Sequence, residues 1–505
     1  MKLKLKKSIV VPGIIVLTGL ILLNLISRNW FVRLDLTDNK MYSLSHSSRN
    51  VINNIDDLLT MKVYFSDDLP GEYGNNRRYL QDILEEYAAY SNGKIRFEFY
   101  RPDADDELEQ EAQKSGIQPV QLQVIEDDKL EVKRVFMGMA ILFEDRREVI
   151  PLIQTTTGLE YEITTRIKKL VETNKKTVAI TRVKETDVTT RNIEMLINER
   201  YQVRYIELAD PVPDNIDVVV MYGLEDSLGI SESDNLKSFI NRGGNLFITQ
   251  GKVKTDIQTQ RANVIQSDIF DFLKGYGLSL ADNLVLDRIC GKVSVQQNIG
   301  FFRMAVPMDY PFLPIVRNFN QEEVLVSGLE QMQLIFPSEI ILDSIPENSN
   351  YHVTPLMYTS DRSSTMKGFF NLNPDPKANP ALRRLGEKGK LLAARSEIVN
   401  QESGIVSQII LVSDSRFLLD SGGGASPENH IFILNAIDYL VGDRGLISLR
   451  SREITSRPLE ELADNAKSRW KWINIILPTT LIIAFGAIRF KRRSNRSKFL
   501  EELYD

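Results

Sequence analysis

The pattern of hydrophobic positions divides the chain into a body and two flanking apolar runs. The runs, 9–27 and 472–488, contain no charged residue. Between them, short alternations of apolar and polar residues predict strands, whereas apolar residues three or four positions apart predict helices. The order of these predicted elements indicates an α/β body joined to a membrane helix at each end.

In the first part of the body, helices and strands are predicted to alternate. Met61, Val63 and Phe65 share one face of a predicted strand, and 94–100 alternates in the same way. This order predicts a thioredoxin-like domain without cysteines, which would serve as a scaffold and not as a redox device. A lead-in with a helix capped by Ser45 or Ser47, two further helices and a β-rich stretch are predicted at 35–58, 76–91, 106–115 and 119–153.

The second part of the body repeats the pattern of strand, helix and strand. Near-continuous apolar runs such as 215–222 are typical of strands buried on both faces of a parallel sheet. The repetition predicts a doubly wound sheet of the amidotransferase or flavodoxin kind. Ser231, with Asp234 three residues later, is predicted to cap one helix. The predicted strands are 176–181, 203–208, 215–222, 246–249 and 407–413, and the predicted helices are 158–170, 189–200, 232–241 and 429–441.

Proline-rich short β runs at 290–365 and a loop-like stretch at 366–395 interrupt this pattern. We interpret them as a β-rich insertion into the sheet domain. The full predicted organisation is a cytoplasmic N-terminus (1–8), a first membrane helix (9–27), the thioredoxin-like domain (28–155), a linking helix (156–175), the α/β domain (176–289 and 401–445), its insertion (290–400), a stalk (446–470), a second membrane helix (471–488) and a basic tail (489–505).

The charge distribution predicts the topology of the two membrane helices. The formal charge is −6; four lysines in 1–7 and a net +3 in 489–505 leave −13 for 8–488. By the positive-inside rule, both termini are expected in the cytoplasm and the acidic body, 28–470, on the far side of the membrane. Runs of this length approximate a hydrocarbon core of roughly 30 Å, the second run only barely. Two helices rarely form a transport pathway, so any channel or motor would belong to partners.

The first run has a second interpretation, namely a cleaved signal peptide. We favour a retained anchor, because the sequence 24–30 offers no small-residue cleavage site. Aromatic side chains at the ends of the runs are expected to anchor them at the lipid interface. They are Trp30, Phe31, Trp470 and Trp472.

Composition and missing motifs exclude several functions. One cysteine, Cys290, excludes a disulfide framework, and three histidines leave little for a metal centre. The acidic balance argues against nucleic acid as a partner. The phosphate-binding loop GxxxxGK[ST], the nucleophile elbow GxSxG and the zinc motif HExxH do not occur. We therefore expect no catalytic residue, no metal and no cofactor.

Polar residues just after the predicted parallel strands form the one candidate site. Ligands bind beyond the carboxyl ends of strands in open α/β sheets. The alternative, which we favour, is that these residues cap helices and close turns. Gly243 and Gly244 are expected in a tight helix-to-strand turn, and 422–424 in a flexible loop. The candidate cleft residues are Thr181, Arg182, Tyr222, Gln250, Lys252, Asp414 and Ser415.

Several strings, in this order and at this spacing, resemble the GldG family. These gliding-motility-associated proteins are auxiliary components of ABC transport systems in Bacteroidetes. The resemblance covers nearly the whole chain, including both apolar runs. The strings are LDLTDNKMYSLS (34–45), KVYF (62–65), GLEYEITTRI (158–167), RGGNL (242–246), YPFLPIV (310–316), PLMYTS (355–360), VSDSRF (412–417) and LNAIDYL (434–440).

The resemblance implies a periplasmic body that works with an ABC permease and a cytoplasmic ATPase in gliding motility and secretion. It offers no catalytic residues. We thus expect a non-enzymatic accessory subunit in the bacterial inner membrane that binds a partner protein or cargo. A periplasmic receptor for a small solute or glycan is the alternative, and an extracytoplasmic hydrolase is a remote one. Homo-oligomerisation is left open by the sequence.

Overall fold

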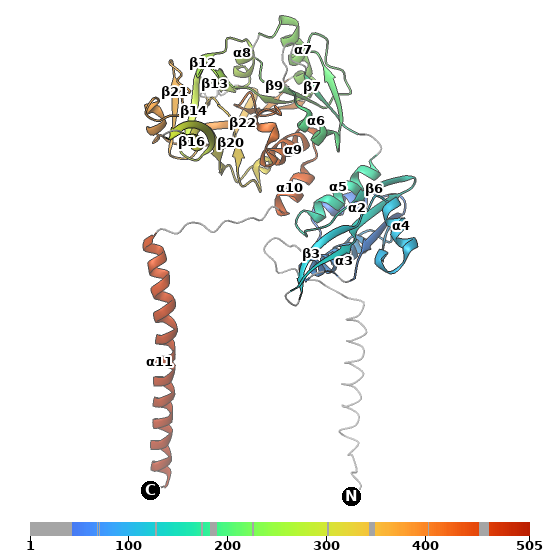
Figure 1. Ribbon diagram of the computed structural model, residues 1–505, viewed down its shortest axis with the longest axis vertical. Coiled ribbons are helices and arrows are strands. Elements are labelled where there is room, and N and C mark those ends of the chain that lie inside the picture. Colours follow the sequence, from blue (N-terminus) through green and yellow to red (C-terminus); the bar gives the residue numbers. More distant parts are fainter. Residues whose placement is uncertain are drawn as a thin grey trace. The chain divides into compact units, whose positions relative to one another are not determined.

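The computed structural model forms two compact units, one up to Ile454 and one from Thr455 to the end (Figure 1). The first apolar run, Trp30 and Phe31 lie outside the described residues. The described residues are 43–67, 69, 71–126, 129–172, 175–181, 189–224, 227–299, 302–342, 349–401, 403–453 and 464–504.

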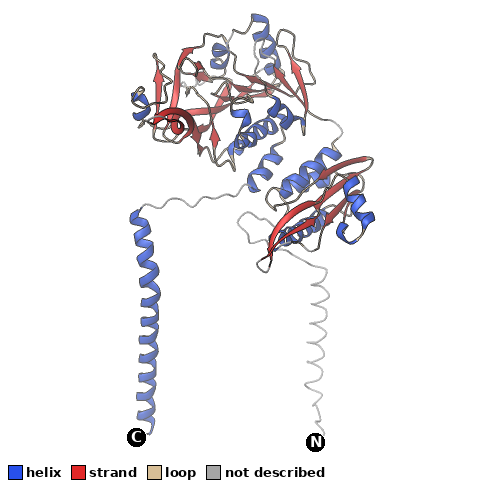
Figure 2. Ribbon diagram, in the orientation of Figure 1, coloured by secondary structure: helices blue, strands red, loops and turns tan. Residues whose placement is uncertain are grey.

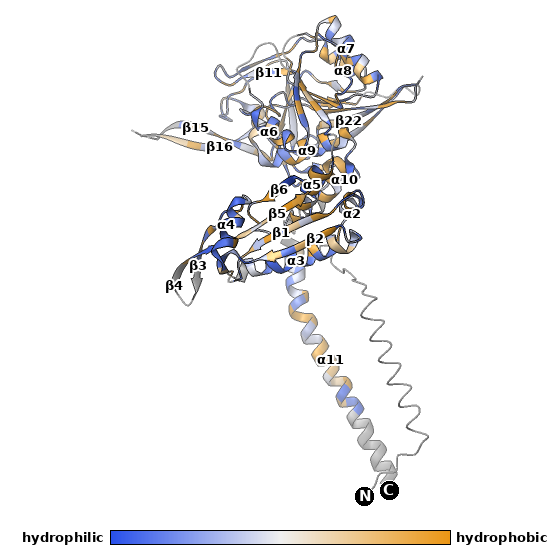
Figure 3. Ribbon diagram, turned by 90° about the vertical axis from the view of Figure 1, so that its right-hand side faces the viewer, coloured by the Kyte–Doolittle hydropathy of each residue, from blue (hydrophilic) through white to orange (hydrophobic). Residues whose placement is uncertain are grey.

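A four-stranded mixed sheet is the centre of the first part of the body. Its order is β2-β1-β5-β6; β1 pairs with β2 in parallel, and β5 is antiparallel to both of its neighbours. Met61, Val63 and Phe65 are buried as predicted, and Tyr64 is buried on the opposite face. Figure 3 shows the apolar residues concentrated in the central strands β1 and β5. The strands are β1 (Leu59–Phe65), β2 (Ile95–Tyr100), β5 (Met137–Phe143) and β6 (Arg146–Ile150).

Helices complete this domain, and a hairpin extends from it. Ser45 caps α2, since its side chain accepts a hydrogen bond from the backbone N–H of Ser48, as expected for one of the two predicted caps. The helices are α2 (His46–Asn53), α3 (Gly71–Tyr90), α4 (Asp106–Lys114) and α5 (Leu159–Val171), with a short 3₁₀ helix η1 (Pro102–Ala104), and the hairpin is β3 (Val120–Glu126) with β4 (Lys129–Val135).

An eight-stranded sheet organises the second part, in the order β17-β20-β22-β23-β10-β9-β7-β8. The five strands from β23 to β8 are parallel and follow the chain in the order 2-1-3-4-5 counted from β8. The strands are β7 (Thr177–Thr181), β8 (Gln202–Ile206), β9 (Val218–Tyr222), β10 (Asn245–Thr249), β17 (Asn318–Phe319), β20 (Tyr351–Tyr358), β22 (Leu391–Val399) and β23 (Val406–Val412).

The segment 290–400 differs from the predicted insertion. Three of its strands, β17, β20 and β22, extend the main sheet in antiparallel fashion. β22 is buried over most of its length, which explains why its apolar residues are continuous and not alternating. Sequence texture alone could not show this, because β20 pairs with β17 and β22 across intervening segments of the chain.

Helices cover both faces of the eight-stranded sheet (Figure 2). One apolar cluster joins the sheet to α6, α9 and α10, and another joins it to α7 and α8. The Gly243–Gly244 turn forms as predicted: Gly243 has a φ of +99°, and the N–H of Gly244 donates to the Phe239 carbonyl. The helices are α6 (Arg191–Asn198), α7 (Ile230–Asn241), α8 (Ile269–Lys274), α9 (Pro427–Val441) and α10 (Arg444–Glu453).

Small sheets and 3₁₀ turns surround one end of the domain. β15 and β16 extend from it as a hairpin (Figure 3). A separate aromatic cluster that includes Tyr310, Phe312 and Phe336 forms their base. The strands are β11 (Val253–Asp256), β12 (Arg261–Val264), β13 (Ser279–Leu280), β14 (Asn283–Asp287), β15 (Cys290–Ile299), β16 (Phe302–Val316), β18 (Met332–Gln333), β19 (Ile340–Ile341) and β21 (Ser363–Lys367), and the turns are η2 (Val324–Val326), η3 (Pro380–Arg383) and η4 (Gly423–Ala425).

Three local predictions were wrong. Helix α7 is capped by Gly229 and not by Ser231, because the Glu232 carboxylate reaches back to the Gly229 N–H. The 422–424 segment is a packed turn, since a Cβ at Gly422 would lie 2.3 Å from the Arg416 carbonyl oxygen. The predicted stalk begins too early: 446–453 belong to α10, which buries Leu446, Ile447 and Leu449.

The second unit contains the helix α11 (Asp464–Tyr504). Within it, Ala466–Arg492 is long and apolar enough to cross a bilayer, and it is the only such helix among the described residues. Trp470 and Trp472 lie in this stretch, and both are exposed. Pro478 interrupts the backbone hydrogen bonding, while the hydroxyls of Thr479 and Thr480 donate to carbonyls one turn earlier.

Candidate functional site

The carboxyl edge of the eight-stranded sheet brings together most of the residues that the sequence predicts for a cleft. The segments that follow β9, β10 and β23 contact one another there. The N–H of Gly251, after β10, donates to Ser415 Oγ, after β23, at 2.7 Å. The loops at this edge are thus tied together by the candidate residues themselves.

Both the oxygen and the nitrogen of the Gln250 side-chain amide form hydrogen bonds to these loops. It is 1% exposed. Its Oε1 accepts from the N–H of Leu224 at 2.6 Å, and its Nε2 donates to the carbonyls of Leu224 and Gly251, both at 2.9 Å. Because two of these hydrogen bonds are to the backbone of Leu224, Gln250 fixes the loop after β9.

Asp414 acts in the same way on two other segments. It is completely buried, and its carboxylate accepts from the N–H of Ile335 and from the N–H of Arg416, both at 2.8 Å. Burial raises the pKa of Asp414 to about 7, although the two N–H donors and the Arg416 charge favour the ionised form. The buried carboxyl group of Asp414 is therefore expected to change its protonation state near neutral pH.

Ser415 fills the space between two of the strand ends. A Cβ built on Gly223 would lie 2.6 Å from the Ser415 Cβ. Such close approach requires glycine at 223, and it leaves no gap between the loops after β9 and β23.

The remaining candidates are also engaged within the fold. Thr181 is buried, and its hydroxyl donates to the Val220 carbonyl at 3.4 Å. Tyr222 is half-buried against the core. Lys252 pairs with Asp282 at 2.9 Å and donates to a backbone carbonyl at 3.2 Å. Arg182 lies outside the described residues.

This edge offers stabilising contacts more than chemistry. Each of the described candidates contacts the loops or the core of its own domain. Burial raises the pKa of Cys290 to about 11, so its reactive thiolate form is disfavoured. Among the residues that the structure describes, no cluster of three or more His, Cys, Asp or Glu side chains could hold a metal ion.

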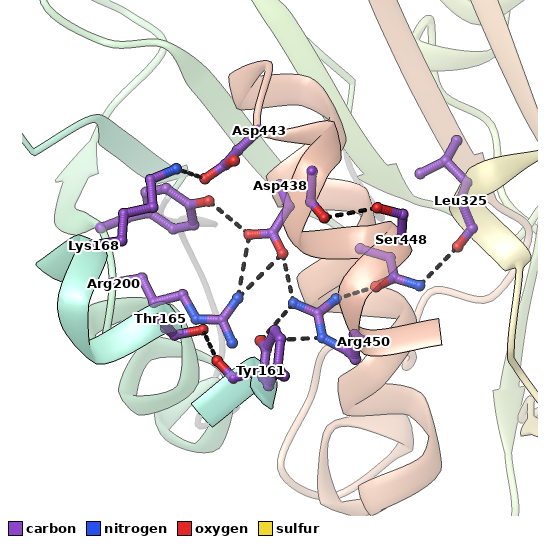
Figure 4. A network of polar contacts seen from close by, with 12 residues as sticks. Tyr161, Thr165, Lys168, Arg200, Leu325, Asp438, Asp443, Ser448 and Arg450 are labelled. Atoms are coloured by element: carbon purple, nitrogen blue, oxygen red, sulfur yellow. Dashed lines mark hydrogen bonds and ion pairs between the residues drawn. The ribbon is translucent and has the colours of Figure 1, made fainter. Parts of the chain in front are cut away.

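A second polar cluster, which sequence analysis missed, surrounds Asp438 (Figure 4). Its carboxylate is completely buried and binds two guanidinium groups: Arg450 at 2.5 Å and Arg200 at 3.1 Å. The Tyr201 hydroxyl donates to the same carboxylate at 2.6 Å. Arg450 also donates to Tyr161 Oη at 2.7 Å, which completes a set that we call the Asp438 junction: Tyr161, Arg200, Tyr201, Asp438 and Arg450.

The Asp438 junction joins four elements, of which α9 and α10 are consecutive and the other two are distant in sequence. Tyr161 lies on α5 of the first domain, and Arg450 lies on α10 at the end of the body. Asp438 lies on α9, while Arg200 and Tyr201 immediately precede β8. The junction therefore connects the first domain, which contains the four-stranded sheet, to the domain of the eight-stranded sheet.

Further contacts join the two domains around α10. We call this boundary between α2, α5, α9 and α10 the seam. Lys168 of α5 pairs with Asp443 just before α10, and both side chains are 20% exposed. The hydroxyls of Ser47 on α2 and Ser448 on α10 are 3.4 Å apart. The last helix of the body thus packs against the first described helix, so the two ends of the body meet.

Desolvation dominates the electrostatics of the junction. Burial lowers the pKa of Arg200, and the Asp438 charge opposes this effect. Burial raises the pKa of Tyr201 well above its ordinary range, and the adjacent Asp438 raises it further. Such a buried cluster is costly to break, because removing one partner leaves another charge uncompensated.

The comparison with protein families matches the α/β domain. Residues 175–436 match the family model described as ABC-type uncharacterized transport system. The chain belongs to this family. It is thus an auxiliary component of an ABC-type transport system. Residues 38–142 match a second model, described as a domain of unknown function.

One relative spans almost the whole chain. It is described as an uncharacterized protein of Borreliella burgdorferi and is 20% identical over 483 residues, which cover 91% of this chain and 93% of the relative. Among solved structures, the mmIFT52 N-terminal domain matches 52% of this chain and 97% of its own at 12% identity and a TM-score of 0.34. A putative ThuA-like protein of Bacteroides uniformis matches 52% and 90% at 11% identity and a TM-score of 0.30.

Proposed function

We propose that this protein is a non-enzymatic, membrane-anchored accessory subunit whose periplasmic body is a rigid scaffold for a partner protein or cargo. The observation that carries the proposal is the seam around α10. This helix is fastened to α5 and α9 by Arg450 and precedes α11, which contains the candidate membrane span.

The meeting of the two ends of the body supports anchoring at both ends. Helix α2 begins at His46, after the segment with the first apolar run, and α10 ends at Glu453, before the second. Their hydroxyl contact between Ser47 and Ser448 would let two neighbouring membrane helices enter one body. We propose that both termini are cytoplasmic and that the body lies in the periplasm of a bacterial inner membrane.

The strand order of the first domain supports a thioredoxin-like assignment. A parallel β1–β2 pair with a helix between them, followed by the antiparallel β5 and β6, has the strand–helix–strand–helix–strand–strand order that the sequence predicts. Cys290, the one cysteine of the sequence, lies in the domain of the eight-stranded sheet and not in this domain. We propose that this domain, like the doubly wound one, serves in binding and not in redox chemistry.

The finer biological role follows the resemblance to the GldG family. We propose that the partners are an ABC permease and a cytoplasmic ATPase, and that the complex serves gliding motility and the associated secretion. The small or polar residues Thr479, Thr480 and Gly486 of α11 would then contact helices of the permease. Homo-oligomerisation remains compatible with this arrangement.

Affinity purification of the tagged full-length protein from native membranes tests the proposal. We expect an ABC permease and its ATPase in fixed ratio to the bait, identified by mass spectrometry. A matched bait in which 472–488 is replaced by an unrelated apolar helix should lose the permease but stay in the membrane. Recovery of the wild-type protein alone, while other membrane complexes survive, would contradict the proposal.

A further inference from the structure

A long groove follows the seam between the two domains of the body. It consists of a pocket of about 780 Å³ and a smaller one of about 210 Å³, which share Glu172 and Lys175. The larger pocket is lined by the start of β6 and the end of α5 on one side and by Thr177, Gln202 and Asn215 on the other. The smaller pocket continues to Asp443, beside the Asp438 junction.

The groove is basic on a body that is acidic. Four cationic side chains and two carboxylates line the larger pocket, whereas the residues 8–488 carry a net charge of −13. Both carboxylates already have basic partners: Glu148 pairs with Lys169 at 2.7 Å, and Glu172 with Lys168 at 3.4 Å. Burial raises the pKa of Glu172 from its ordinary value, and the Lys168 charge opposes this effect.

Two of the basic groups remain available to a ligand. Within the described part of the chain, neither Arg147 nor Lys175 forms an ion pair, and both are exposed. Arg147 only donates to the backbone carbonyl of Lys114 at 3.3 Å. These two charges face a groove whose own acids are neutralised, so an anionic group would meet attraction and little repulsion.

Strand edges on both sides of the groove favour an extended ligand. β6 is the last strand of the four-stranded sheet, and β8 is the last strand of the eight-stranded sheet. The groove is lined by Arg146–Glu148 at the start of β6 and by Gln202 at the start of β8. Terminal strands carry backbone donors and acceptors that an added extended segment can pair with.

We propose that this seam groove binds an acidic, extended polypeptide segment of a partner protein. Arg147 and Lys175 would hold the acidic side chains, and the free edge of β6 would pair with the backbone of the segment. Because the groove contacts both α5 and the 442–443 turn before α10, an occupied groove would brace the two domains against each other. This inference names the chemistry of the partner, and it rests on the proposed scaffold function only for its biological meaning.

Fluorescence anisotropy with the purified full-length protein in detergent tests the groove directly. The probe is a labelled peptide of alternating glutamate and valine, about ten residues long, near the upper length of ordinary strands. We expect saturable binding that weakens as salt is raised, because exposed charges are screened. The Arg147→Glu, Lys175→Glu double variant should bind at least about tenfold more weakly, since it reverses the charges that attract the probe.

Two controls separate the parts of the proposal. The Lys377→Glu, Arg383→Glu variant makes the same charge change on the segment between β21 and β22 and should bind within about twofold of wild type. A backbone N-methylated peptide keeps the charges but loses the strand donors, and it should bind at least about tenfold more weakly.

Three results would overturn the inference. They are equal loss of binding in the control variant, full competition by inorganic tripolyphosphate together with normal binding of the N-methylated peptide, and no binding of the acidic peptide at low salt. The measurement needs no ABC component. Failure here therefore leaves the accessory-subunit proposal standing, and failure of the co-purification leaves the groove standing.

Discussion

Two completely buried aspartates, Asp414 and Asp438, stabilise the structure in different ways. Asp414 lies at the carboxyl edge of the sheet and accepts hydrogen bonds from backbone N–H groups of Ile335 and Arg416. Asp438 lies in the middle of α9 and binds the side chains of Arg200, Tyr201 and Arg450. The first fixes loops within one domain, whereas the second joins both domains to the last helix of the body.

The comparison teaches that polar residues at strand ends need not indicate a ligand. In open α/β sheets, ligands usually bind at this edge. Here the described polar residues at the edge form hydrogen bonds or ion pairs within the domain, or lie against its core. The residues that join the two domains of the body lie instead on helices, where the sequence shows no motif.

The largest expected effect comes from breaking the Asp438 junction. Arg450→Met removes a guanidinium that contacts Asp438, Tyr161 and Asn435. We expect the free energy of unfolding to fall by about 3–5 kcal/mol, because a buried carboxylate loses one of its partners. Calorimetry of the full-length protein in detergent measures this change.

Arg444→Met on the same helix is the matched control for this prediction. Arg444 is exposed and lies over the Tyr439 ring at 4.4 Å, so its loss should cost less than about 1 kcal/mol. Asp438→Asn combined with Arg450→Met should be less stable than Arg450→Met alone, because it also leaves the buried Arg200 without its carboxylate partner. Equal effects of the two arginine substitutions would refute the special position of the junction.

Asp414 should make the stability depend on pH in one direction. Its folded pKa of about 7 lies above the ordinary 3.8, so the folded state binds more protons between these values. Stability from this group should therefore decrease as pH rises from 4 to 7, by up to about 4 kcal/mol. Asp414→Asn should flatten that part of the stability profile, and an unchanged profile would refute the titration.

Gly223→Ala tests the close packing at the sheet edge. The new Cβ would meet Ser415, so we expect a loss of about 1–3 kcal/mol from overpacking. The second substitution Ser415→Gly removes the opposing Cβ and should restore part of this loss in a thermal melt. If the double variant were less stable than the sum of the single variants predicts, the steric explanation would be wrong.

The smallest expected effect concerns the outer part of the seam. Lys168→Met removes the pair with the partly exposed Asp443 and the pair with the exposed Glu172. We expect a loss of about 1 kcal/mol, with weaker dependence on salt in the variant than in wild type. A loss as large as that of Arg450→Met would mean that the outer pair, and not the buried cluster, secures the domains.

Much of the fold could be predicted from periodicity. The strand at Met61–Phe65 and the helices near α5 and α9 match their apolar patterns, because each element buries one face or both. The helix cap at Ser45 was also predictable, since capping is a local interaction. At the candidate site, only the contact between Asp414 and the N–H of Arg416 is local, whereas Asp414 with Ile335 and Ser415 with Gly251 join distant parts of the chain.

The participation of β20 and β22 in the main sheet could not be predicted in this way. β20 pairs with β17 and β22 across intervening segments, for example Asn318 with Tyr358, and texture does not reveal such partners. Arg450 likewise belongs to a sequence stretch that resembles a charged stalk. Only its burial against Tyr161 shows that α10 is part of the body.

By itself, the sequence determined what depends on near neighbours: the positions of most strands and helices, the apolar run inside α11, and the absence of the common catalytic motifs. The tertiary structure decided which polar groups are buried together. The physical reason is that a charge such as that of Asp438 tolerates burial only when partners converge on it, and those partners, Arg200 and Arg450, lie 238 and 12 residues away in the chain.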